Sequence, residues 1–191
     1  MHRLSTNFVL GYHGCDLKTA EALIAGDPFK PSSNDYDWLG HGIYFWEANP
    51  QRGLDFALEV SKRKNTKIIQ PAVVGAVIEL GQCLDMATQS AVEMVKLAYN
   101  SQEATFRKAG RSIQSERLRP LDCAVVMRAH TLMEQQNIKC DTVRGIFIEG
   151  EPIYPGSGFN SKTHAQIAVR NKDCIKGVFR VPHDHLRPIL S

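Results

Sequence analysis

The stretch of sequence that decides the fold is GHGIYFW, at positions 40–46. Two glycines lead into a run of large apolar and aromatic residues, which is the pattern of a strand that leaves a loop and enters a core. Successive side chains of a strand point to opposite faces. We therefore expect Phe45 to point into the core, while Tyr44 lies on the other face and is available to a site.

The segments on either side of this stretch indicate further strands and helices. Asp16 and Asn49 are placed to act as N-caps, and Pro50 suits a first helical turn. Residues 27–39 are rich in Pro, Ser, Asn and Asp, which predicts a loop. The expected strands are residues 8–12, 42–46, 72–80, 143–149, 165–170 and 177–181, and the expected helices are residues 17–24 and 51–64.

The middle of the chain, residues 86–136, is helical in pattern and is divided by Pro120. Strands at both ends with helices between them predict an α+β fold, in which strands pair across long sequence distances. A chain of 191 residues is expected to form one domain. We place this domain at residues 1–182, with a helical insertion at about 86–136 and a flexible, unstructured tail at 183–191.

Composition restricts the class of protein. Hydrophobic residues make up 43% of the chain and charged residues 23%, as in ordinary globular domains. The five cysteines are scattered and form no C-x-x-C pair, which argues against a disulfide framework or a structural zinc site and suits a reducing cytoplasm. We find no signal peptide and no apolar run long enough to cross a bilayer. We expect a cytoplasmic protein with no membrane partner.

Three motifs carry a resemblance to a known family. They are YHG at positions 12–14, GHGIYFW at 40–46 and THAQIAV at 163–169. In this order and spacing they resemble the His-Tyr-Glu branch of the ADP-ribosyltransferase superfamily, the branch of diphtheria toxin and the poly-ADP-ribose polymerases. The resemblance spans nearly the whole chain but matches residues 86–136 poorly. It implies split central β-sheets with flanking helices, and an enzyme that uses NAD+ as co-substrate without a metal.

The resemblance also implies roles for individual residues. His13 would hydrogen-bond a ribose hydroxyl of NAD+, and the main chain of Gly14 would hold the nicotinamide carboxamide. Tyr44 would stack on the nicotinamide, and Phe56 would approach its other face, although the residues alone favour a core position for Phe56. The implied NAD+-binding residues are His13, Gly14, Ser32, Asn34, Gly42, Tyr44 and Phe56, and the implied catalytic residues are His13, Tyr44 and Gln166.

Gln166 departs from the family, which has a Glu at that place. An amide accepts a hydrogen bond but is no general base and carries no charge. Either Gln166 suffices because the acceptor is a good nucleophile, or Glu149 or Glu151 supplies the carboxylate, or the chain binds NAD+ or ADP-ribose without catalysis. We prefer the first two explanations jointly. Without the Glu, we expect transfer of single ADP-ribose units rather than of polymers.

The acceptor is expected to be a macromolecule. The loop at residues 151–162 presents Tyr154, Phe159, Asn160 and Lys162, and aromatic residues beside a basic one favour RNA or DNA slightly over protein. A basic stretch at residues 107–119, with Arg107, Lys108, Arg111, Arg117 and Arg119, points the same way. By analogy, a small transferase of this kind would be a toxin with an antitoxin or immunity partner. An RNA 2′-phosphotransferase is a third possibility, but we identify no basic phosphate-binding set for it.

Several residues have simpler interpretations. We expect Trp38 and Trp46 to pack in the protein rather than take part in chemistry. His41 is expected to be a loop residue. His164 shares a strand face with Gln166 and either meets the acceptor or lies on the surface. We treat His183 and His185 as polar tail residues, because two histidines without further ligands make a weak metal site.

Overall fold

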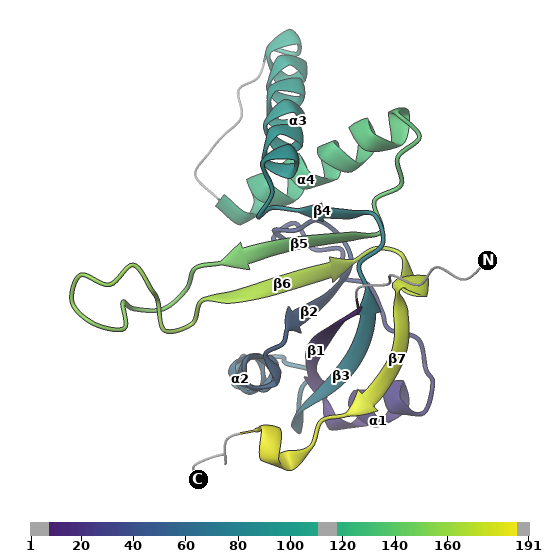
Figure 1. Cartoon of the computed structure of the whole chain (residues 1–191), viewed down its shortest axis with the longest axis vertical. Helices are drawn as coiled ribbons and strands as arrows, with labels where there is room; N and C mark the ends of the chain where they lie inside the picture. The colour runs from purple at the N-terminus through teal and green to yellow at the C-terminus, as the bar shows by residue number, and fades with distance from the viewer. Residues whose placement is uncertain (1–7, 111–117, 187–191) are drawn as a thin grey trace.

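The computed structural model of the chain describes residues 8–110 and 118–186, which form a mixed α/β fold with a seven-stranded sheet and four α-helices (Figure 1). The strands are β1 Phe8–Asp16, β2 Ile43–Glu47, β3 Pro71–Glu79, β4 Cys83–Asp85, β5 Thr142–Phe147, β6 His164–Val169 and β7 Ile175–Arg180. The helices are α1 Leu17–Ile24, α2 Pro50–Ser61, α3 Gln89–Lys108 and α4 Leu118–Gln135, with short 3-10 helices η1 Lys172–Cys174 and η2 His183–His185.

The sheet has the strand order β4-β5-β6-β2-β1-β3-β7, and its two halves are joined by a narrow link. β1 pairs with β3 at nine positions but with β2 at only two, Gly11 with Glu47 and Tyr12 with Trp46. Beyond Tyr12 the two central strands separate. The described residues thus form one continuous sheet with a weak joint at its middle, where the resemblance implied split sheets.

Two hydrophobic cores cover the sheet. One gathers around Phe45, Val74 and Ile167, all fully buried, and is closed by α1. The other contains Leu39 and Val143 together with apolar residues of α3 and α4. The prediction that Phe45 points into the core is confirmed. The mixed α/β fold is compatible with the predicted α+β class, and α3 and α4 lie within the segment predicted to be helical.

Both predicted helix caps are present. The side chain of Asp16 accepts a hydrogen bond from the main-chain N–H of Lys18, and that of Asn49 accepts one from Arg52. Pro50 is the first residue of α2, where its missing N–H costs no helical hydrogen bond. The second helix ends at Ser61, a few residues earlier than predicted.

Four predictions about the elements need correction. β1 continues to Asp16, so the YHG motif lies inside the strand and not at its end. β4 was missed altogether. Pro120 does not divide the helical segment but lies in the first turn of α4, where proline is tolerated. The tail predicted to be unstructured begins with η2, while residues 187–191, like Arg111 and Arg117, lie outside the described residues.

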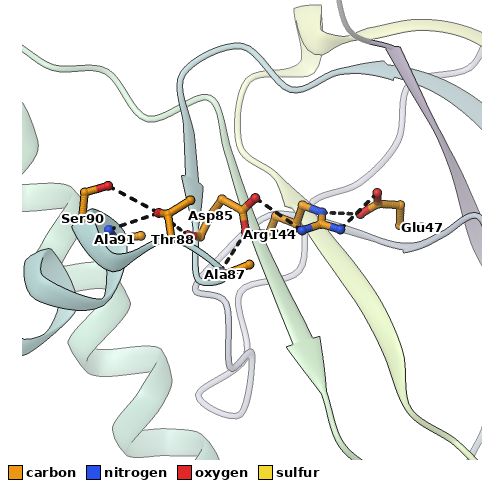
Figure 2. A network of polar contacts seen from close by, with 7 residues as sticks. All are labelled: Glu47, Asp85, Ala87, Thr88, Ser90, Ala91 and Arg144. Atoms are coloured by element: carbon orange, nitrogen blue, oxygen red, sulfur yellow. Dashed lines mark hydrogen bonds and ion pairs between the residues drawn. The ribbon is translucent and has the colours of Figure 1, made fainter.

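A polar network on one face of the sheet holds β2, β4 and β5 together (Figure 2). Arg144 of β5 donates to the carboxylate of Glu47 at the end of β2, and to Asp85 of β4 at 3.3 Å. The carbonyl of Asp85 accepts a bond from the Thr88 hydroxyl at 2.7 Å, and Thr88 caps α3. The network thereby ties the start of the helical segment to the sheet.

Among the described helices, none is long and apolar enough to cross a membrane.

Candidate active site

A cavity of about 530 Å³ opens where β1 and β2 separate. Every residue of the predicted site lines it, although these residues come from β1, the loop before β2, β2 itself, α2 and β6. The predicted residues that line it are His13, Gly14, Ser32, Asn34, Gly42, Tyr44, Phe56 and Gln166. The fold therefore brings together positions that are spread over most of the chain.

The main chain of Gly14 faces this cavity. The C=O of Leu10 accepts a hydrogen bond from the N–H of Ala48, so Leu10 directs its main-chain groups towards the β2 side. The N–H and C=O groups of successive residues in a strand point to opposite neighbouring strands, so those of every second residue point to the same side. The main-chain groups of Tyr12 and Gly14 therefore also point towards the β2 side. Pairing with β2 stops at Tyr12. The N–H and C=O of Gly14 are thus left without a β2 partner and are directed into the space between the strands.

Gly14 has a second reason to be glycine. A Cβ atom at this position would lie 2.1 Å from the main-chain oxygen of Gly53 in α2, which is impossible without movement of the helix. α2 therefore rests directly on β1, and this close packing brings Phe56 to the cavity wall.

His13 has a defined protonation pattern. Its Nδ1 lies 2.9 Å from the carbonyl oxygen of Tyr44. A carbonyl only accepts hydrogen bonds, so Nδ1 carries the proton and donates it. Burial lowers the pKa of His13, and the bond to Tyr44 offsets this only in part. The neutral ring keeps a lone pair on Nε2, which can accept a hydrogen bond from a ligand hydroxyl.

Tyr44 supports the loop that precedes β2. Its hydroxyl accepts a hydrogen bond from the N–H of Leu39 and donates one to the C=O of Gly40, each at 2.9 Å. Burial raises the pKa of Tyr44, so the phenol stays neutral. With the hydroxyl engaged by the loop, the ring is the part of Tyr44 that a ligand can contact.

Ser32 and Asn34 belong to the loop that lines the cavity, and hydrogen bonds within this loop hold them in place. The buried carboxylate of Asp37 accepts from the Ser32 hydroxyl at 3.0 Å and from the main-chain N–H of Asn34 at 2.8 Å. The Asn34 amide donates to Ser32 at 2.7 Å, and Ser32 forms a β-bridge with Gly42. The loop is thus internally bonded and keeps a fixed shape over the cavity.

Gln166 is held by an indole. Its Oε1 accepts a hydrogen bond from Nε1 of Trp38 at 2.7 Å. Because an indole N–H only donates, this contact fixes the amide with its oxygen towards Trp38. The amide NH₂ group of Gln166 and one lone pair on its oxygen are then left for other partners.

Several cavity residues were not predicted as functional. Trp38 and Trp46 were expected to pack, but both also line the cavity. Trp46 lies two residues after Tyr44, so the alternation of the strand is a signal that could have found it. Phe56 packs on Trp46 with ring centroids 4.8 Å apart, at the cavity wall and not in the core. Three cations complete the wall: Lys30 and Arg63, which no sequence pattern marks, and Arg119, which belongs to the predicted basic stretch.

A smaller cavity of about 120 Å³ adjoins the first on the Gln166 side. It shares Trp38, Trp46, Phe56, Arg63, Arg119 and Gln166 with the main cavity and adds Arg52, Glu59, Phe147, Glu149 and His164. Of the two carboxylates considered as substitutes for the family Glu, Glu149 lies here, whereas Glu151 is exposed and lines neither cavity. His164 is buried, which excludes the surface position considered for it.

Glu149 is paired with Arg52 at 2.9 Å. Burial raises the pKa of Glu149, but the hydrogen bond and charge of Arg52 outweigh this and leave it below its ordinary value. Glu149 is therefore ionised at neutral pH and provides a negative charge beside Gln166.

The acceptor loop predicted at residues 151–162 belongs to an arm that projects from β5 and β6 (Figure 1). Tyr154 and Phe159 are exposed on it, as expected for a contact surface. The side-chain amide of Asn160 donates a hydrogen bond to the carbonyl of Gly150 at 2.7 Å and so stabilises the loop. Lys162 approaches Glu59 at 3.3 Å and lies at the base of the arm.

Comparison with known proteins adds one short match. A stretch of 36 residues is 50% identical to part of an uncharacterized protein of Methanocaldococcus jannaschii. This stretch covers 19% of the chain and 17% of that protein. No family model matches the sequence, and no solved structure matches it. A function for the chain thus has to be argued from the geometry of its cavities.

Proposed function

We propose that this chain is a NAD+-dependent mono-ADP-ribosyltransferase, which transfers one ADP-ribose unit from NAD+ to a macromolecular acceptor. The observation that carries the proposal is the convergence at one cavity. Residues chosen from a motif resemblance alone, on five separate segments, all line the same 530 Å³ space. A cavity of this size is in the range that binds nucleotide-sized ligands.

The groups at this cavity suit the parts of NAD+. The free N–H and C=O of Gly14 match the C=O and NH₂ of a carboxamide, and the ring of Tyr44 offers a stacking surface for the nicotinamide. Nε2 of His13 is an acceptor for a ribose hydroxyl. Lys30 and Arg63 provide positive charge for the diphosphate.

The residues at the Gln166 side suit the charge of the reaction. Cleavage of the bond between nicotinamide and ribose passes through an oxocarbenium-like state, with positive charge at the anomeric carbon. The carboxylate of Glu149 opposes that charge from the adjoining cavity, and the amide of Gln166 bonds the ribose hydroxyl that the family Glu would hold. Aromatic walls from Trp38 and Trp46 exclude water from the ribose.

The direct test is nicotinamide release from NAD+ by the purified chain. We expect His13→Ala and Tyr44→Ala to reduce release at least a hundredfold. Glu149→Gln should reduce it at least tenfold, because the substitution keeps the shape of the side chain but removes the negative charge, and with it the ion pair to Arg52. Glu151→Gln is the matched control and should match the parent, since Glu151 is exposed and lines neither cavity. Unchanged release in His13→Ala and Tyr44→Ala would overturn the proposal.

A second candidate is an NAD+- or ADP-ribose-binding module without catalysis. The bond between Trp38 and Oε1 of Gln166 favours it, because it occupies the atom that stands where the family has a carboxylate. Calorimetry distinguishes the two. Tight binding of NAD+ with no nicotinamide released over several hours would establish the module and exclude the transferase.

A further inference from the structure

We infer that the smaller cavity is the acceptor site and that it takes a nucleobase of a single-stranded nucleic acid. The inference rests on the proposed function and deepens it by naming the substrate class. The smaller cavity adjoins the main one and shares six lining residues with it, Gln166 among them, and it adds five residues of its own. A base bound there would lie next to the ribose that is being transferred.

Several buried polar atoms around the smaller cavity have no partner among the residues that the structure describes. Trp46, Arg52 and His164 all line the smaller cavity, and none is more than 8% exposed. Within the described part of the chain, Nε1 of Trp46, Nε of Arg52 and Nε2 of His164 have no hydrogen-bond partner, while Nη1 of Arg52 lies 3.5 Å from the carboxylate of Glu59. Buried polar groups are nearly always paired, so several unpaired ones around one cavity indicate a missing polar ligand.

These atoms differ in the hydrogen bonds that they can make. Trp46 and Arg52 can only donate. Nδ1 of His164 lies 2.6 Å from the carbonyl oxygen of Lys162 and donates to it, so Nε2 of the neutral ring can only accept. The ligand must therefore carry acceptors and a donor within one small group. A guanidinium offers donors alone and a carboxylate offers acceptors alone, whereas the edge of a nucleobase offers both.

The walls of the smaller cavity favour a base over a side-chain amide. Four aromatic side chains line the cavity: Trp38, Trp46, Phe56 and Phe147. Ring centroids of Trp38 and Phe147 are 5.1 Å apart, and the guanidinium of Arg119 lies over Phe147 at 4.9 Å. Aromatic walls of this kind stack a planar heterocycle, and Arg63 and Arg119 beside them are placed for phosphates. A base can enter such a cavity only when it is not stacked within a duplex. We therefore expect the nucleic acid to be single-stranded.

The chemistry balances without a further reactant. An amino nitrogen of the base attacks the anomeric carbon of the nicotinamide ribose and forms a C–N bond. The bond from that carbon to nicotinamide breaks, its electron pair returns to the pyridinium ring, and neutral nicotinamide leaves. The attacking nitrogen loses one proton, which Nε2 of His164 accepts.

The experiment offers NAD+ labelled in the adenylate part to the full chain with three acceptors. These are single-stranded DNA and RNA oligonucleotides of mixed sequence, and a nuclease-treated protein extract. We expect the oligonucleotides to take the label and nuclease digestion to release it as a modified nucleotide. His164→Ala should reduce transfer at least tenfold and keep the NAD+ affinity within twofold. His183→Ala changes an exposed histidine outside both cavities and should transfer like the parent.

A second variant tests the same cavity independently, in case His164→Ala does not fold. Phe147→Leu keeps an apolar side chain at a half-buried position but removes the stacking ring, and we expect at least a tenfold loss of transfer with an unchanged unfolding midpoint. Label on protein alone, or nicotinamide release with no labelled acceptor, would overturn the nucleobase inference and leave the transferase standing. Oligonucleotide transfer that survives both variants would overturn the assignment of this cavity. No nicotinamide release with any acceptor would refute the proposed function itself.

Discussion

Tyr44 shows how one side chain both shapes the site and takes part in it. Its hydroxyl bonds Leu39 and Gly40, and its ring faces the cavity. Tyr44→Phe keeps the ring but leaves the N–H and C=O of the loop unpaired, so we expect a loss of about 1–3 kcal/mol in the free energy of unfolding. Urea unfolding measures this loss, and calorimetry should find NAD+ bound more tightly by Tyr44→Phe than by Tyr44→Ala. Equal affinities of the two variants would contradict a stacking role.

Substitution of Gly14 tests whether α2 packs directly on β1. The Cβ of Gly14→Ala would meet the oxygen of Gly53 at 2.1 Å, so α2 must shift away from β1. We expect a cost of about 1–3 kcal/mol, typical of overpacking. Gly177→Ala is the control, because a Cβ there meets nothing within 4 Å, and its stability should stay within about 0.5 kcal/mol of the parent. Chemical denaturation that finds equal stabilities would show that α2 is not in direct contact with Gly14.

At the scale of elements, the Arg144 network carries a prediction about how the outer strands are held (Figure 2). Arg144→Met leaves Glu47 and Asp85 without their shared cation in a place where the three side chains are 18–28% exposed. We expect a loss of about 1–3 kcal/mol. Arg180→Met breaks an exposed pair with Glu21, which water screens, and should leave the free energy of unfolding nearly unchanged. Similar losses in urea unfolding for both variants would contradict a structural role for the network.

The elements that the sequence predicted well are those with a strong local signal. Asp16 and Asn49 mark helix starts by cap chemistry, and the alternation around Phe45 marks β2. β4 has only three residues and forms through parallel pairing with β5, which no local pattern encodes. The end of β1 was misplaced for a similar reason, since its last residues become strand by pairing with β3.

The site was predictable to the extent that motifs mark it. His13, Tyr44 and Gln166 were found because they stand in recognisable strings, and they line one cavity. Arg63 was not singled out, because a cation just after the end of a helix looks like any surface cation until the fold brings it to the cavity. Arg119 was noted as part of a basic stretch, but its place at the cavity was not predicted. The unpaired atoms around the smaller cavity are likewise a property of packing, which only coordinates reveal.

At the scale of the whole molecule, two unequal sheet halves meet at the two paired positions between β1 and β2. The separation of these strands beyond Tyr12 creates the cavity, so the site exists because the sheet is nearly interrupted. A ligand that contacts both β1 and β2 would strengthen this joint. Saturating NAD+ should therefore raise the unfolding free energy, by about 2.7 kcal/mol at a hundred times its dissociation constant. Thermal scans with and without NAD+ measure this, and no change in midpoint would contradict binding at this site.

Buried histidines make the stability of the whole molecule depend on pH. Burial lowers the pKa of His13 and His164, and burial together with the charge of Arg170 lowers that of His130 to about 3. Histidines of the unfolded chain take up protons near pH 6.5 while these three do not, so the unfolded state binds more protons as the pH falls. Stability should then decrease below about pH 6.5. For His130 the decrease approaches about 1.4 kcal/mol per pH unit and continues to about pH 3, and His13 and His164 add to it in the same direction.

His130 allows that account to be tested with one substitution. Both of its ring nitrogens are buried without a partner in the described part of the chain, so His130→Leu removes a titrating group without breaking a hydrogen bond. Urea unfolding between pH 7.5 and pH 5 should give a shallower pH dependence for His130→Leu, by about one proton, at little cost near neutral pH. The exposed His183 provides the control, and His183→Leu should follow the parent curve. If His130→Leu follows it as well, the acid sensitivity comes from other groups.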